Sequence, residues 1–288
     1  MGADLLDIPE IAEVFETMSE GLELDLVNLA TKGTTEEVND TEAAQALTMA
    51  VSVGLGRALR ARGFAPDAII GFSLGQISAL VLANVLSLED ATALLKVRSK
   101  AMAQACAAHP GGMVALMGAT LEDAEALCAE AAEGDVLVCA NHNAPGQIVI
   151  SGDNDALERA QAAWKEAGKK SVRLATSGGF HSPLMADAAQ EVEKFCGSLE
   201  FNEPSVTLIC NTDAKPFVSA QAAQRLGLHV RSGVMFEQSV RSLLDDGETD
   251  FVEVGFGGVL TNLVKRIDRS ANRVCVGNRE AFDEFIAA

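Results

Sequence analysis

Apolar residues recur along the chain with two periods, one typical of helices and one typical of strands. Helical spacing marks most of residues 1–32, residues 41–62 and residues 87–108. Between the last two lie a short apolar run, Ala68–Ile70, which predicts a buried strand, and the apolar segment Gln76–Val85, which predicts a helix. Strands and helices in alternation indicate an α/β protein.

From residue 112 the predicted elements follow a different order. The predicted strands are residues 113–117, 135–140, 147–151 and 171–175, and the predicted helices are residues 121–132 and 155–167. This is the β-α-β-β-α-β order of a ferredoxin-like unit. We therefore expect a small ferredoxin-like subdomain over residues 112–178, inserted into a large α/β core made of residues 1–111 and 179–288.

The α/β pattern then returns. The predicted strands are residues 206–210, 251–254 and 274–276, and the predicted helices are residues 184–196, 219–228, 236–244 and 259–267. Such alternation favours a mostly parallel sheet. The turn Gly255–Gly258 precedes the last of these helices and fits either a phosphate cradle or close packing of a helix on a sheet.

The segment Gly71-Phe72-Ser73-Leu74-Gly75 lies between the strand and the helix named first. A Gly-x-Ser-x-Gly sequence in that position predicts the nucleophile elbow of an α/β-hydrolase-like core, because the tight turn exposes the serine and crowds any side chain at Gly71 or Gly75. The Leu74 amide, which follows the nucleophile, would donate to an oxyanion. The alternative is a serine that caps a helix.

Two further side chains are candidates for the same site. His181 follows Gly178-Gly179-Phe180 where the chain returns from the small subdomain, so it would lie at a cleft; a capping or interface histidine is the alternative. Arg98 falls on the apolar stripe of the helix over residues 87–108, and a buried guanidinium needs an anion. The alternatives are a structural pair with a buried Asp or Glu, or a side chain that extends its charged end to solvent, and the pattern alone favours these.

Composition excludes several classes of function. A net charge of −19 argues against nucleic-acid binding. We find no apolar run of membrane-spanning length, no secretory signal and no metal site. The six scattered cysteines read as reduced thiols of a cytoplasmic protein.

Together these residues resemble the malonyl-CoA:acyl-carrier-protein transacylase family, which includes the acyltransferase domains of polyketide synthases. The resemblance covers nearly the whole chain and rests on Gly71–Gln76, Val97–Met102, Asn143–Gln147, Ser177–Met185, and Glu253–Gly255 before Val259 and Leu260.

The resemblance implies transfer of a malonyl group from malonyl-CoA to the phosphopantetheine thiol of acyl carrier protein, in fatty acid or polyketide synthesis, with no permanently bound cofactor. Ser73 would be the nucleophile, His181 the general base, Leu74 the backbone oxyanion donor and Arg98 the ligand of the malonyl carboxylate. It also implies that a backbone carbonyl near Asp246 steadies the histidine. The alternatives are an acyltransferase or thioesterase-type hydrolase for another acyl-CoA, and a degenerate, non-catalytic homologue.

The sequence departs from the family pattern at two places. Phe72 stands where the family usually has histidine before the nucleophile. The chain opens at Met1-Gly2-Ala3, without the family's first strand and its Gly-Gln loop, whose glutamine is the second oxyanion donor. From this we expect weak activity, since losing one such donor costs about 10²-fold or more.

An acyl carrier protein is itself acidic, so the resemblance also implies a local basic docking patch on this acidic chain. Two clusters are candidates: Lys265, Arg266 and Arg269, and Lys169, Lys170 and Arg173. Ordinary solvated surface charge is an equal alternative.

Overall fold

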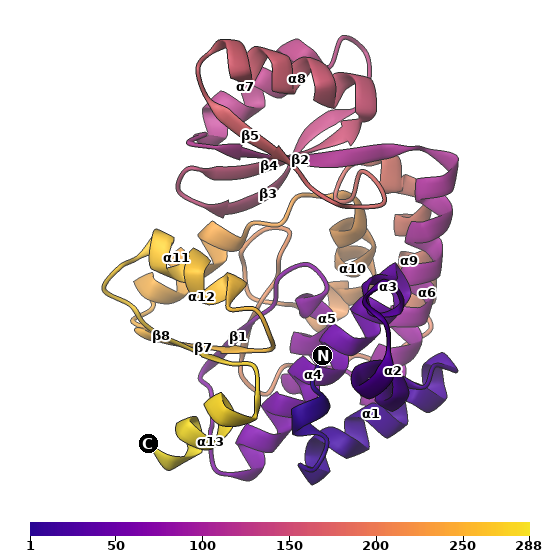
Figure 1. Cartoon of the computed structure of the whole chain (residues 1–288), viewed down its shortest axis with the longest axis vertical. Coiled ribbons are helices and arrows are strands. Elements are labelled where there is room, and N and C mark those ends of the chain that lie inside the picture. Colours follow the sequence, from indigo (N-terminus) through magenta and orange to yellow (C-terminus); the bar gives the residue numbers. More distant parts are fainter.

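The computed structural model describes residues 1–288. Figure 1 shows a small sheet-containing part at one end of the long axis, with the larger, mostly helical part below it. Both termini lie in the larger part (Figure 1).

The first part of the chain is helical, as its apolar spacing predicts. Its helices are α1 (Pro9–Leu22), α2 (Leu26–Lys32), α3 (Thr35–Asn39) and α4 (Thr41–Ala61), after a 3-10 turn at Ala3–Leu5. The region predicted as one mostly helical stretch is divided, because Glu23 adopts a left-handed conformation (φ 58°) that ends α1. Asp40 then caps α4 by accepting hydrogen bonds from the Glu42 and Ala43 amides.

The predicted nucleophile segment forms between a strand and a helix. Strand β1 (Ala68–Ile70) pairs in parallel with β6 (Thr207–Ile209), and helix α5 (Gly75–Leu82) follows β1 directly. Helix α6 (Leu88–Ala108) comes next, capped by the Ser87 hydroxyl. Helices α1, α4, α5 and α6 share the largest hydrophobic core of the molecule.

The small part contains the elements β2 (Gly111–Met117), α7 (Leu121–Ala131), β3 (Leu137–Ala144), β4 (Gln147–Asp153), α8 (Asn154–Glu166) and β5 (Lys170–Arg173). Its four strands pair antiparallel in the order β3-β4-β2-β5. Helices α7 and α8 cover the outer face of this sheet (Figure 1). The helices and sheet enclose a separate core that includes the buried Trp164.

The remaining elements return to the large part: α9 (Ala186–Cys196), α10 (Ala222–Arg231), α11 (Phe236–Asp245), β7 (Asp250–Val254), α12 (Val259–Ile267), β8 (Asn272–Val276) and α13 (Arg279–Ala287), with 3-10 turns at Pro183–Met185 and Ser219–Gln221. Strands β7 and β8 pair in parallel. The parallel pairing is as predicted, but the strands of the large part form two separate two-stranded sheets, β1-β6 and β7-β8.

One predicted boundary is wrong. The sequence predicts that this strand ends at residue 140, yet β3 runs to Ala144 and buries the polar residues Asn141, His142 and Asn143. The strand tolerates them because their backbone bonds to the large part: the His142 amide donates to the Val234 carbonyl (2.9 Å) and the Val234 amide donates to the Ala140 carbonyl (2.9 Å). This backbone pairing joins the two parts of the chain.

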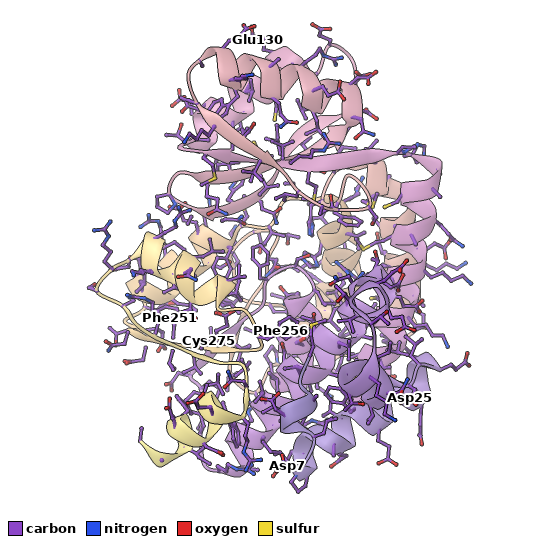
Figure 2. All side chains as sticks on the ribbon, viewed as in Figure 1. Asp7, Asp25, Glu130, Phe251, Phe256 and Cys275 are labelled. Carbon is purple, nitrogen blue, oxygen red and sulfur yellow. The ribbon has the colours of Figure 1, made fainter.

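Acidic side chains lie at both ends of the molecule. Figure 2 shows Glu130 on α7 at one end of the molecule, and Asp7 and Asp25 at the opposite end.

No helix combines the length and the apolar character needed to cross a membrane.

Candidate functional site

The turn between β1 and α5 holds Ser73 in a left-handed conformation, with φ 49°. A non-glycine residue rarely adopts this geometry, and in a nucleophile elbow it exposes the serine hydroxyl. Gly71 is required: a Cβ there would lie 2.1 Å from the backbone carbon and oxygen of Gly75. The expectation that Gly75 is crowded too is wrong, because a Cβ there meets no atom within 4 Å.

The structure brings Ser73 and His181 together from positions 108 residues apart. The Ser73 Oγ lies 2.8 Å from the His181 Nε2. His181 is 4% exposed and, like the serine, has a left-handed backbone (φ 57°). Two strained residues that meet in a hydrogen bond are typical of a reactive site.

Two backbone carbonyls orient the His181 ring. Its Nδ1 lies 3.0 Å from the His229 carbonyl and 3.1 Å from the Ser232 carbonyl. Carbonyl oxygens only accept, so Nδ1 carries the proton and Nε2 is free to accept the serine proton. The resemblance places this carbonyl near Asp246, and this is wrong: Asp246 follows the last residue of α11, whereas the carbonyls lie at the end of α10.

Arg98 lies in the same buried region, 4% exposed. Its Nη1 donates to the Gln45 Oε1 (2.5 Å), while its Nε is buried with no hydrogen-bond partner. No carboxylate pairs with it, so the alternative of a structural ion pair is excluded. Burial lowers the pKa of Arg98 to about 10, so the guanidinium stays charged at neutral pH and lacks an anion.

The pKa of His181 is lowered to about 4. Burial is the largest cause, the charge of Arg98 adds to it, and the two carbonyls on Nδ1 partly oppose both. At neutral pH the ring is therefore the free base, which a general base must be.

The Leu74 amide donates no hydrogen bond within the chain, whereas the Gly75 amide after it donates to the Phe72 carbonyl (2.9 Å). It is thus free to donate at the start of α5, where the helix dipole favours negative charge. The Phe72 ring packs edge-on against Phe236, with ring centroids 5.4 Å apart, at the border of a hydrophobic cluster.

The sequence did not predict two residues of this site. Asn211, just after β6, accepts a hydrogen bond from the Ser73 amide (2.8 Å). Gln45, in α4, contacts Arg98. The one available signal for Asn211 was its position after the end of a predicted parallel strand, where polar residues often serve a site; Gln45 gave none.

The glycine-rich turn before α12 is already occupied. The Glu253 carboxylate accepts hydrogen bonds from the Thr261 amide (2.7 Å) and the Leu260 amide (3.3 Å). An acidic side chain at that helix start opposes a second anion, which argues against the phosphate cradle. The glycines instead serve the turn itself, because Gly255, Gly257 and Gly258 all have positive φ (140°, 107° and 64°).

The candidate docking cations differ in how free they are. Lys169 pairs with Asp123 (3.0 Å) and lies over the Trp164 ring. Arg266 bonds to Gln147 of the small part, and Lys265 beside it is exposed.

The His, Cys, Asp and Glu side chains form no group of three that could hold a metal ion.

Comparison with known proteins places this geometry in a family. Residues 1–279 match the model of the acyl transferase domain family. The chain is 34% identical over 287 residues to the malonyl CoA-acyl carrier protein transacylase of Bacillus subtilis, covering 98% of this chain and 90% of that protein. It is 38% identical over 264 residues to the enzyme of that name from Escherichia coli K12, covering 90% and 85%.

Solved structures agree. The crystal structure of a malonyl-CoA:acyl carrier protein transacylase from Xanthomonas oryzae pv. oryzae superposes with a TM-score of 0.95 at 38% identity, covering 100% of this chain and 93% of that one. A malonyl-transacylase in complex with its type II PKS acyl-carrier protein superposes with a TM-score of 0.95 at 33% identity, covering 100% and 94%.

Proposed function

Because this chain belongs to the malonyl-CoA:acyl-carrier-protein transacylase family, we propose that Ser73 and His181 perform its acyl transfer. The chain is an acyltransferase that moves a malonyl group from malonyl-CoA to acyl carrier protein. The observation that carries the proposal is the contact of 2.8 Å between Ser73 Oγ and His181 Nε2 in a buried site that also holds an unpaired guanidinium. The same contact argues against a degenerate homologue.

In the first half-reaction, Ser73 Oγ attacks the thioester carbonyl and its proton passes to His181 Nε2. The carbon–sulfur bond breaks, and the imidazolium returns the proton to the coenzyme A thiolate. The products are a malonyl-serine ester and free coenzyme A. The reaction needs no permanently bound cofactor, because the thioester supplies an activated acyl group.

In the second half-reaction, the phosphopantetheine thiol of the carrier gives its proton to His181 and attacks the ester carbonyl. The bond from the carbonyl carbon to Ser73 Oγ breaks, and the serine regains its proton. The Leu74 amide would stabilise the oxyanion in both steps, since it is the unengaged donor next to the nucleophile.

Arg98 would bind the free carboxylate of the malonyl group. Its buried Nε has no partner, and its Nη1 is fixed by Gln45, so a carboxylate would satisfy the remaining donors in a charge-assisted pair. This role favours malonyl over uncharged acyl groups, which would leave the guanidinium buried and unpaired.

We also propose the domain organisation expected from the sequence. The strand order β3-β4-β2-β5, with both helices on one face, supports a ferredoxin-like subdomain over residues 112–178. Residues 1–111 and 179–288 would then form the large acyltransferase core. We further propose a cytoplasmic location, because all six cysteines are free thiols, as is typical of a reducing compartment.

For the carrier, the exposed Lys265 and the neighbouring Arg266 are the better docking candidates, because Lys169 is already engaged by Asp123. Charge reversal at Lys265 and Arg266 should raise the apparent KM for the carrier and leave that for malonyl-CoA unchanged. An unchanged carrier KM would exclude this patch.

The function is tested by steady-state transfer from malonyl-CoA to a phosphopantetheinylated carrier, with His181→Gln as the comparison. We expect transfer by the wild type and a loss of about 10²-fold or more in kcat for the variant. A variant as active as the wild type would overturn the role of His181.

A further inference from the structure

Asn211 connects the nucleophile turn to the elements that hold the base. It lies just after β6 and is 1% exposed. Its side-chain oxygen, its side-chain nitrogen and its backbone amide all form hydrogen bonds. Its Nδ2 donates to the Gly71 carbonyl (2.7 Å), and its own amide donates to the Gln76 Oε1 (2.9 Å). Its Oδ1 faces both the Ser73 amide (2.8 Å) and the His229 Nε2 (3.2 Å).

The main chain fixes which way the Asn211 amide points. The Ser73 N–H can only donate and the Gly71 C=O can only accept, so the oxygen must face the former and the nitrogen the latter. A flipped amide would set donor against donor and acceptor against acceptor, both buried. The orientation is therefore determined without reference to any hydrogen position.

That orientation sets the protonation of His229. Because Asn211 Oδ1 is an acceptor, the His229 Nε2 beside it must carry the proton. Burial, followed by electrostatic interaction with His181 and Arg98, lowers the pKa of His229 well below its ordinary value, which agrees with a neutral ring. The backbone carbonyl of the same residue accepts from His181 Nδ1.

We propose that Asn211 is a positioning residue for acyl transfer, which holds the strained Ser73 turn and, through the His229 ring, ties that turn to the residue whose carbonyl orients His181. The serine and its base come from segments 108 residues apart, and Asn211 makes direct bonds to the turn of one and the support of the other. The inference rests on the proposed function in so far as the positioned groups are the nucleophile and its base.

The hydrogen bonds of Asn211 stabilise the turn at Ser73, where the backbone is strained. Ser73 keeps a positive φ that costs free energy unless its surroundings hold it. The Asn211 side chain holds the backbone that leads into the strained residue at two points, the Gly71 carbonyl and the Ser73 amide, and its own amide bonds to the Gln76 side chain that follows. Without the side-chain bonds the turn can relax, and the serine oxygen moves away from the His181 Nε2.

The test compares Asn211→Ala, which loses all the side-chain hydrogen bonds, with His229→Leu, which loses one ring hydrogen bond and keeps the carbonyl. A displaced nucleophile lowers kcat about 10²-fold for Asn211→Ala, with KM for malonyl-CoA within about threefold. His229→Leu should lose only about threefold to tenfold in kcat, since the bonds to Gly71 and Ser73 remain.

Thr92→Val is the matched control. Thr92 is equally buried (1% exposed) and its hydroxyl donates to the Leu88 carbonyl within α6, away from the proposed catalytic groups. It loses one buried hydrogen bond and should keep the wild-type kcat. A kcat loss in Thr92→Val as large as that in Asn211→Ala would overturn the positioning role and assign the effect to general destabilisation.

Phenylmethylsulfonyl fluoride, which sulfonylates an activated serine without needing a malonyl group, separates this inference from the proposed function. We expect the rate of Ser73 modification, read by intact mass, to fall in Asn211→Ala in parallel with kcat. A wild-type rate of modification in Asn211→Ala would overturn the positioning role. A wild type that reacts with the reagent but transfers no malonyl group would contradict the proposed function. The rate of Ser73 modification in Asn211→Ala, compared with that of the wild type, would then still test the role of Asn211.

If Asn211→Ala does not fold, Asn211→Asp carries the comparison, because it keeps the size and the acceptor for the Ser73 amide but loses the donor to Gly71. We expect about a tenfold loss in the rate of Ser73 modification. No loss would overturn the proposal.

Discussion

His181 and Arg98 are electrostatically coupled: burial first, and the guanidinium charge second, lower the pKa of the histidine to about 4. The coupling has a consequence for the reaction. A malonyl carboxylate bound to Arg98 would neutralise part of the charge that disfavours imidazolium, and so would make His181 a stronger base when the correct substrate is present.

The acid limb of the pH–rate profile should therefore differ between free enzyme and complex. For kcat/KM, which reports the free enzyme, activity should fall as pH drops through about 4, where His181 becomes protonated. For kcat, which reports the complex, the fall should come at higher pH. Arg98→Gln should move the kcat/KM limb upward, because a cation that lowers the pKa is removed. Acid limbs that coincide in all three measurements would contradict the coupling.

Arg98 should also decide acyl selectivity. Arg98→Ala removes the proposed ligand of the malonyl carboxylate, and a lost charge-assisted pair corresponds to a drop of about 10- to 100-fold in kcat/KM for malonyl-CoA. Acetyl-CoA lacks the carboxylate, so its turnover should be unchanged or improved. Lys96→Ala on the same helix, whose ammonium pairs with the exposed Glu23, is the control and should alter neither. Equal losses with both thioesters would refute the assigned role.

The two glycines of the elbow should respond differently to the same substitution. Gly71→Ala places a methyl group 2.1 Å from the backbone of Gly75, so the turn must shift and both stability and activity should fall strongly. Gly75→Ala meets no atom within 4 Å at the start of α5, where alanine is the better helix former, so its melting temperature should be equal or higher. Thermal unfolding of the pair measures this difference; equal destabilisation by both would show that the turn is not packed as described.

Buried neutral histidines should make the fold sensitive to acid. The folded-state pKa of His181 is lowered, so below about pH 6.5 the unfolded chain binds a proton that the folded chain does not. The free energy of unfolding should thus fall as pH decreases from about 6.5 to about 4, by about 3 kcal/mol for His181 alone. His229, with its pKa also lowered, adds to the same slope. Denaturant unfolding at several pH values measures it, and His181→Gln should reduce the slope by about one proton. An unchanged slope would contradict the burial of a neutral ring.

Local patterns in the sequence were enough to predict most helices and strands, because these depend on apolar spacing and caps. Gly71 and Ser73 were predictable for the same reason, since a strand, a tight turn and a helix follow one another within a few residues. Arg98 stood out because a cation on an apolar stripe breaks the pattern. That no carboxylate pairs with it could be learned only from the fold.

What the sequence could not provide is set by contacts between distant segments. Asn211 reaches the Ser73 turn across 138 positions, and Gln45 reaches Arg98 across 53. The carbonyls on His181 come from backbone, which carries no residue-specific signal. His142 falls outside the predicted strand over residues 135–140, because its buried position in β3 depends on pairing with Val234 of the large part. Each case is decided by tertiary packing rather than by local propensity.

Ser73 should take the malonyl group as an ester, which is measured by the intact mass of the protein after incubation with malonyl-CoA and a rapid quench. We expect a single malonyl adduct on the wild type and none on Ser73→Ala. An adduct that persists in Ser73→Ala, or a wild type that transfers malonyl to the carrier without ever forming an adduct, would contradict this role of Ser73.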